Sequence, residues 1–152
     1  MKCQSWPGNM ENKTNHLLSK LSVAIRVANE NLMCEVGLHA GQAQILMELW
    51  AEDRQSQAEL AKKLCVSPPT VNKMAKKLSD AGFVTIQRCP DDGRLKRVRL
   101  TAKGARIQPK VEEQLDKLET ILLKDLSETE RLLVPLLLER LHKNVLALIT
   151  SG

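Results

Sequence analysis

The chain has almost no aromatic residues. Its 152 residues contain Trp6, Trp50 and Phe83 and no tyrosine. Proteins that bind single-stranded nucleic acid stack its bases on aromatic side chains, so the sequence disfavours that mode of binding. Hydrophobic residues still make up 43% of the chain, which is enough for a packed core. That core is therefore expected to consist mainly of Leu, Val, Ile, Ala and Met.

Long hydrophobic runs are also lacking. The longest apolar stretch, residues 132–138, has seven residues and contains Pro135, whereas a membrane-spanning helix needs about 20. Residues 1–9 include no apolar segment of the kind found in signal peptides. We therefore expect a cytoplasmic protein with no membrane partner.

Sequence patterns for cofactor chemistry are missing as well. The four cysteines, at positions 3, 34, 65 and 89, form no CxxC pair, and no two of the three histidines are three or four residues apart. The thiols are expected to be reduced, with no metal site and no cofactor. The chain also has no carboxylate pair with a histidine, no glycine-rich phosphate loop and no nucleophile elbow. We therefore expect that the protein is not an enzyme.

The positive charge is concentrated in the middle of the chain. Residues 54–106 hold thirteen Lys or Arg and four acidic residues, a net charge of +9, whereas each flank has a net charge of −2. A basic module between two mildly acidic flanks is typical of a polyanion binder, and nucleic acid is the first candidate. Charge alone leaves open an ordinary solvated surface rich in lysine.

The spacing of apolar and capping residues predicts the secondary structure. Helices are expected over residues 17–34, 41–51, 56–64 and 67–80, and strands over 83–88 and 96–100. Thr101 is expected to begin one long helix, and a capping box at Ser127 begins the last, within which Pro135 marks either a kink or the true start. This order predicts a mainly α fold with a small β-hairpin wing, a winged helix-turn-helix.

Three segments follow from this layout. Residues 1–10 form a loose tail, because they contain Pro7, Gly8 and Asn9. Residues 37–104 form the winged helix-turn-helix module. Residues 11–36 and 105–152 form a helical part on either side of it.

The helix at 67–80 has the pattern of a DNA-recognition helix. Val71, Met74, Ala75 and Leu78 share one face, which is expected to dock on the core. The rest of the surface is polar or small enough to enter the major groove. Asn72 carries both a donor and an acceptor and can read adenine or bind a phosphate. The predicted DNA-binding residues of this helix are Ser67, Pro69, Thr70, Asn72, Lys73, Lys76 and Lys77.

The turn between the two predicted strands gives an independent signal. Asp92-Gly93-Arg94 lies at its tip, and a turn of this size can place an arginine in the minor groove. Asp92 is expected to pair with a neighbouring arginine and orient it, although Asp91 and Asp92 also suit a plain turn. The predicted DNA-binding residues of the wing are Arg88, Asp92, Arg94, Lys96 and Arg97.

Taken together, these motifs resemble the MarR family of bacterial transcriptional regulators. The resemblance rests on residues 56–61, 66–71, 78–84, 92–94 and 100–104. It implies a homodimer in which the first helix and the last two interlock, and which presents two winged modules to a pseudo-palindromic DNA operator. It also implies repression that a ligand or oxidation relieves. Asn72-Lys73 departs from the Thr-Arg that family members often have.

The signal that would release DNA is left open by the sequence. The resemblance implies a small-molecule effector bound between the dimerisation helices and the winged module. A redox alternative uses Cys34, Cys65 or Cys89, and Lys62 and Lys63 would favour a thiolate at Cys65. Burial of Cys65 as a small apolar residue is the favoured interpretation.

Two less favoured alternatives remain. One is metal sensing through Glu30, Cys34, Glu35 and His39, which lacks ligands at the matching turns of the helix that follows Thr101. The other is a winged helix used only for protein–protein contact, which the charge of the module disfavours.

Overall fold

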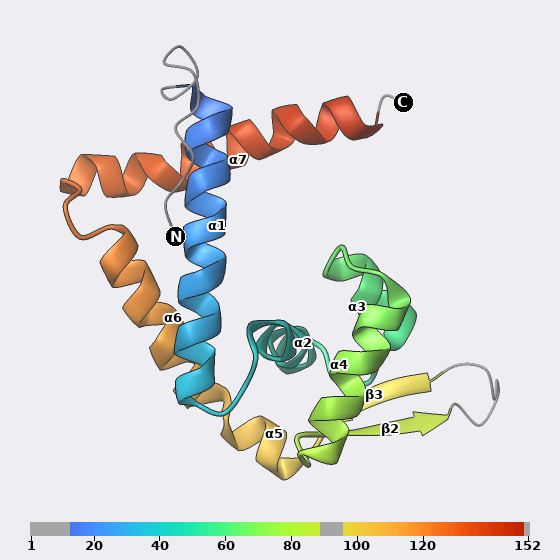
Figure 1. The fold of residues 1–152 in the computed structure, drawn as a ribbon. Helices are drawn as coiled ribbons and strands as arrows, with labels where there is room; N and C mark the ends of the chain where they lie inside the picture. The colour runs from blue at the N-terminus through green and yellow to red at the C-terminus, as the bar shows by residue number, and fades with distance from the viewer. Residues whose placement is uncertain (1–12, 89–95, 151–152) are drawn as a thin grey trace. The chain divides into compact units, whose positions relative to one another are not determined.

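The computed structural model describes residues 13–88 and 96–150 (Figure 1). The described residues fall into two compact units, one ending at Leu115 and the other beginning at Asp116. None of the described helices is both long and apolar enough to cross a membrane. The helices are α1 (Thr14–Glu35), α2 (Ala40–Ala51), α3 (Gln57–Lys63), α4 (Pro68–Asp80), α5 (Ala102–Arg106), α6 (Gln108–Leu122) and α7 (Glu128–Thr150).

A small antiparallel sheet completes the first unit. Its strands are β1 (Gln55–Ser56), β2 (Val84–Arg88) and β3 (Lys96–Leu100), in the order β1-β3-β2. Val98 of β3 pairs with Gln55 on one side and Ile86 on the other, and its side chain is fully buried. The mainly α fold with a β-hairpin wing is thus confirmed. Strand β1 was not predicted, because a two-residue strand is too short to show a period of alternation.

Side chains cap the helix starts that the sequence marks. Ser56 Oγ accepts the Glu59 amide at 3.1 Å, while the Glu59 carboxylate accepts the Ser56 amide at 2.7 Å. Ser67 caps α4 by accepting the amide of the third residue after it. Ser127 also begins α7, so Pro135 lies inside that helix and does not mark its start. These local signals were read correctly because a cap needs only residues within one turn.

Helices α1, α3 and α4 end in the same hydrogen-bond pattern. The residue after each C-cap is left-handed, with φ of 77° at Gly37, 53° at Cys65 and 79° at Gly82. Its amide and the next one bond back to the last turn, as in a Schellman motif. A glycine is usual at this position, so Cys65 stands where a side chain is disfavoured.

The prediction of one long helix after Thr101 is wrong. Thr101 caps only the short helix α5, and a break at Ile107 separates it from α6. Pro109 explains the break, because it has no amide hydrogen to donate to the Ala105 carbonyl and its ring would collide with that carbonyl. As the second residue of α6, Pro109 is compatible with a new helix start.

The core lies between α2, α3, α4 and the sheet, with α1 and α6 contributing one side. It is mainly aliphatic, as the scarcity of aromatics predicts. Trp50 donates its indole N–H to the Gly104 carbonyl at 2.9 Å, which ties α2 to α5. The largest fully buried side chains are those of Met33, Ile45, Leu46, Leu49, Leu60, Leu78, Val71, Val84, Val98 and Val111.

Candidate nucleic-acid interface

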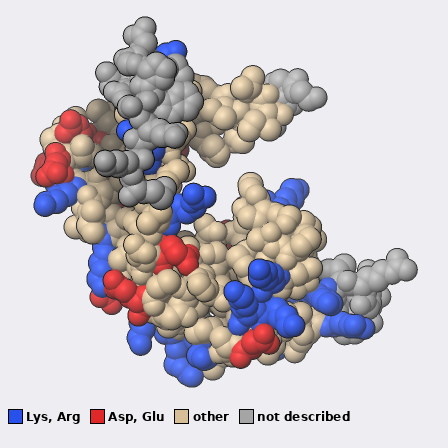
Figure 2. All heavy atoms as spheres, in the orientation of Figure 1, with Lys and Arg blue, Asp and Glu red and all other residues tan. Residues whose placement is uncertain are grey.

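Helix α4 has one buried face and one exposed face. Val71, Ala75 and Leu78 have no exposed surface, and Met74 is half-buried against α2 beside Gly41. This is the docking stripe that the sequence predicts. The predicted polar residues of the helix are all exposed, namely Ser67, Pro69, Thr70, Asn72, Lys73, Lys76 and Lys77. Figure 2 shows Lys and Arg side chains over α4 and near the end of the hairpin.

Two of these residues have a structural task as well. The Ser67 and Thr70 hydroxyls are 2.8 Å apart, and Ser67 Oγ accepts the Thr70 amide at 3.4 Å. These hydrogen bonds fix the first turn of α4, with Pro68 as its first residue. The amides of that turn and the three lysines Lys73, Lys76 and Lys77 place positive charge along the exposed face.

The wing is described only along its strands. Arg88 and Lys96 form the last described cross-strand pair, and both are exposed. The predicted wing residues Asp92 and Arg94, together with Asp91 and Cys89, lie outside the described residues. On β3, Arg97 and Arg99 are exposed on either side of the buried Val98. The strand therefore alternates between exposed and buried side chains and presents its cations to solvent.

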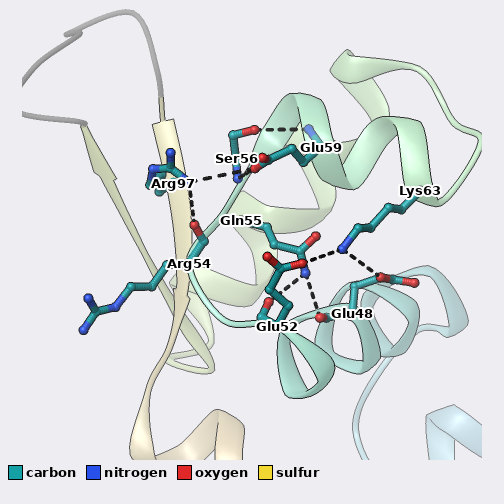
Figure 3. Close-up of polar contacts among 8 residues, drawn as sticks. All are labelled: Glu48, Glu52, Arg54, Gln55, Ser56, Glu59, Lys63 and Arg97. Carbon is teal, nitrogen blue, oxygen red and sulfur yellow. Dashed lines mark hydrogen bonds and ion pairs between the residues drawn. The ribbon is translucent and has the colours of Figure 1, made fainter.

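Arg97 also holds β3 to the start of α3 (Figure 3). Its guanidinium donates to the Arg54 carbonyl at 3.0 Å and lies 3.9 Å from the Glu59 carboxylate. The Ser56 amide and hydroxyl, with a smaller effect of the Arg97 charge, hold the pKa of Glu59 below its usual value. Glu59 is therefore ionised at neutral pH and offsets part of the Arg97 charge.

The Lys63 side chain points toward the end of α2 and does not belong to the exposed surface of α4. Its ammonium lies 2.9 Å from the Glu52 carboxylate and 3.8 Å from that of Glu48. The hydrogen bond to Glu52, with the nearby acidic charges, raises the pKa of Lys63. Lys63 thus carries a charge that two carboxylates already balance.

Arg54 is a cation that the sequence did not single out. It is exposed and extends away from the polar network in Figure 3. Its φ of 64° and the hydrogen bond from the Leu100 amide to Asp53, at 2.8 Å, shape the loop that carries it. Its place in the basic segment was the available signal, but the conformation of the loop depends on Leu100, which lies 47 positions after Asp53.

The described cysteines are both accessible. Cys34 and Cys65 are exposed free thiols, so the expected burial of Cys65 is wrong. Its left-handed backbone after α3 directs the side chain outward, whereas its neighbours Leu64 and Val66 pack on the core. Of the residues weighed as metal ligands, Glu30, Cys34 and His39 come together with their ligand atoms within 4.8 Å of one another, and Glu35 is not in this group.

Two adjoining pockets lie among α1, α2 and α6 within the first unit. One has a volume of about 160 Å³ and the other about 300 Å³, and Met47 and Leu115 line both. Asn29 lines the smaller pocket, and its side-chain oxygen is buried without a hydrogen-bond partner among the described residues. A buried acceptor of this kind is costly unless a ligand or water satisfies it.

Comparisons with known proteins agree with this geometry. Residues 38–96 match the model of the MarR family. An uncharacterized HTH-type transcriptional regulator of Bacillus subtilis, YdgJ, is 28% identical over 109 residues; the match spans 72% of this chain and 66% of that protein, just under two thirds of its length.

Solved structures show the same fold over most of the chain. A MarR transcriptional regulator from Methanosarcina mazei has a TM-score of 0.79 at 28% identity, covering 88% of this chain and 96% of the other. The PcaV transcriptional regulator from Streptomyces coelicolor, solved in complex with its natural ligand, has a TM-score of 0.74 at 20% identity, covering 91% of this chain and 98% of the other. The fold is thus that of the winged-helix regulators whose motifs the sequence resembles.

Proposed function

We propose that this chain is a transcriptional regulator and not an enzyme, and that it binds a double-stranded DNA operator in the cytoplasm. The match of residues 38–96 to the MarR family model and the likeness to an HTH-type transcriptional regulator support this proposal. The observation that carries the proposal is α4. Its apolar stripe packs on the core. Its opposite face presents to solvent the Asn72 side-chain amide, the lysines Lys73, Lys76 and Lys77, and a capped first turn.

Helix α4 and the wing have different tasks in this proposal. Helix α4 enters the major groove, where Asn72, Lys73 and Lys76 face base edges and the Thr70 methyl group faces a thymine methyl. The wing follows the backbone with Arg88 and Lys96. Arg94, oriented by Asp92, reaches the minor groove. Residues 37–104 are therefore the DNA-binding module.

Substitution of Asn72 distinguishes the contribution of base recognition to DNA binding from the contribution of charge. We expect Asn72→Ala to weaken operator binding by about 1–3 kcal/mol and to weaken non-operator DNA much less, because a bidentate contact to one base is lost. Titrations of both duplexes at one fixed salt concentration measure this ratio. Lys62→Ala, which removes an exposed charge on α3, is the control and should weaken both duplexes alike. An unchanged ratio for Asn72→Ala would exclude base reading by Asn72.

We further propose a homodimer formed by residues 11–36 and 105–152, with residues 1–10 as a tail outside it. Helices α1 and α7 each expose apolar side chains to an extent that a monomer disfavours; Val27 is 53% exposed and Leu132 73%. Two-fold pairing would cover them. Sedimentation at micromolar concentration is expected to give a dimer, and a stable monomer would contradict it. The large apolar side chains exposed on α1 and α7 are those of Leu17, Leu21, Val23, Val27, Leu132, Leu133, Leu136, Leu137, Leu138, Leu141, Val145, Leu146, Leu148 and Ile149.

Repression by occlusion, released by a small-molecule effector, completes the proposal. The pockets beside Asn29 and Trp50 suit a small amphipathic ligand, because apolar walls surround an unsatisfied acceptor. The redox alternative rests on the exposure of Cys34 and Cys65, with Cys89 outside the described residues. Footprints on the regulator's own promoter, repeated with candidate ligands and with an oxidant, distinguish the two modes of release.

A further inference from the structure

Three side chains of different chemistry meet where α1 ends and α2 begins. Glu30 and Cys34 lie one turn apart on α1, and His39 directly precedes α2. His39 Nδ1 lies 2.5 Å from Glu30 Oε1, and Cys34 Sγ lies 3.9 Å from the same oxygen. We propose that Glu30, Cys34 and His39 form a binding site for a divalent metal ion of the zinc class.

The donor set matches that class of metal. Zinc takes thiolate, imidazole and carboxylate ligands, whereas magnesium and calcium take oxygen alone. Bonds of about 2.0–2.3 Å at tetrahedral angles hold neighbouring ligand atoms about 3.3–3.8 Å apart. The three ligand atoms here all lie within 4.8 Å of one another, so small side-chain rotations bring them to that spacing.

The surroundings of the site favour binding over a plain helix cap. Glu30 uses its other oxygen, Oε2, to accept the Ala40 amide at 2.9 Å, which leaves Oε1 facing His39 and Cys34. A hydrogen bond from a second group fixes a ligating carboxylate in many metal sites.

The site is open to solvent, which gives the ion an entry path. The His39 and Glu30 side chains are 61% and 42% exposed, and the Cys34 thiol is free. Three protein ligands leave a fourth tetrahedral position for a water molecule. Such a site binds reversibly, in contrast to the closed four-ligand sites that hold a structural zinc.

A bound ion would fix the corner between α1 and α2. His39 is the N-cap residue of α2, and its amide donates to the Gln42 side chain at 2.8 Å. Gly41, two residues further on, lies against Met74 of α4. Metal binding therefore acts on the helix end that supports α4. Binding of the ion itself does not depend on the proposed DNA binding and is tested without DNA.

Cobalt titration of the full-length, reduced protein tests the site. We expect one Co²⁺ per chain and a thiolate-to-cobalt charge-transfer absorption, which Zn²⁺ displaces. Cys34→Ser should abolish the absorption, whereas Cys65→Ser should keep it, since Cys65 is the other exposed thiol among the described residues. Zn²⁺ should also raise the thermal midpoint of the wild type and not that of Cys34→Ser.

Two further variants separate a chelate from a lone thiolate. Glu30→Gln keeps an acceptor for the Ala40 amide, and His39→Asn keeps a good N-cap residue, so both are expected to fold. Each should lower Co²⁺ affinity about tenfold or more. The proposal is overturned if wild type shows no charge-transfer absorption, if Cys34→Ser retains it, if Cys65→Ser loses it, or if both ligand variants bind Co²⁺ like wild type.

Discussion

Raising the salt concentration from about 50 to about 200 mM is expected to weaken operator binding by about 10³-fold or more, because affinity falls by about 0.9 logarithmic units per phosphate for each tenfold rise in salt. A dimer that neutralises six phosphates reaches this figure. Each subunit offers exposed cations in excess of that need, on α3, on α4 and along the hairpin. They are Lys62, Lys73, Lys76, Lys77, Arg88, Lys96 and Arg99.

The structure supplies a matched pair of variants for this measurement. Lys77→Gln removes an exposed charge from α4 and should lower the slope by about 0.9 for each subunit that contacts a phosphate. Lys63→Gln removes the same charge from α3, but Glu52 and Glu48 already balance it, so the slope should be unchanged. A flat salt dependence of the wild type would contradict DNA binding through this basic surface.

The same ion pairs explain where sequence reading of the site was incomplete. Arg97 was predicted as a DNA-binding residue from its place in the wing, and whether it binds DNA stays a prediction. In the structure its guanidinium is held by the Arg54 carbonyl, 43 positions earlier in the chain. No local sequence pattern predicts such a partner, because β1 and β3 come together only when the sheet forms. The net charge of residues 54–106 is therefore larger than the charge that is available to bind phosphates.

Local features of the fold were predictable from the sequence. The caps at Ser56, Ser67 and Ser127 and the left-handed glycine at Gly82 depend on residues within one turn. The period of α4 placed Val71 and Leu78 inside and the polar residues outside, since tertiary packing agreed with the helix period. Helix α4 was therefore correct in its bounds and its orientation, whereas its contacts with DNA stay a prediction.

The errors have physical reasons too. Strand β1 exists because β3 pairs with it, and Cys65 is exposed because the turn after α3 imposes a left-handed backbone on it. The break at Ile107 was readable from Pro109, but the prediction rested on the regular apolar spacing after Thr101 and did not take the proline into account. Metal sensing through Glu30, Cys34, Glu35 and His39 was disfavoured because the helix after Thr101 lacks ligands at the matching turns. The turn between α1 and α2 brings the ligand atoms of Glu30, Cys34 and His39 together, and whether they bind a metal stays a prediction.

Gly104→Ala is expected to destabilise the protein by about 1–3 kcal/mol, although alanine is the better helix former by about 1 kcal/mol. A Cβ at this position of α5 would lie 2.1 Å from the Phe83 carbonyl oxygen. That carbonyl cannot retreat freely, because it accepts the Thr101 amide at 3.1 Å. Urea unfolding followed by tryptophan fluorescence, at one fixed protein concentration, measures the loss.

Gly41→Ala is the matched control for that loss, because it adds the same methyl group to another helical glycine. There the added Cβ would lie 2.5 Å from Met74 Sδ, which is the end of a flexible side chain and not backbone. Met74 can rotate away, so the loss should be about 1 kcal/mol or less. If the two variants are equally destabilised, the rigidity of the Phe83 carbonyl is not the cause. If Gly104→Ala is as stable as wild type, α5 does not pack closely on the Phe83 carbonyl that follows α4. That contact would then not help to hold α4 beside the hairpin.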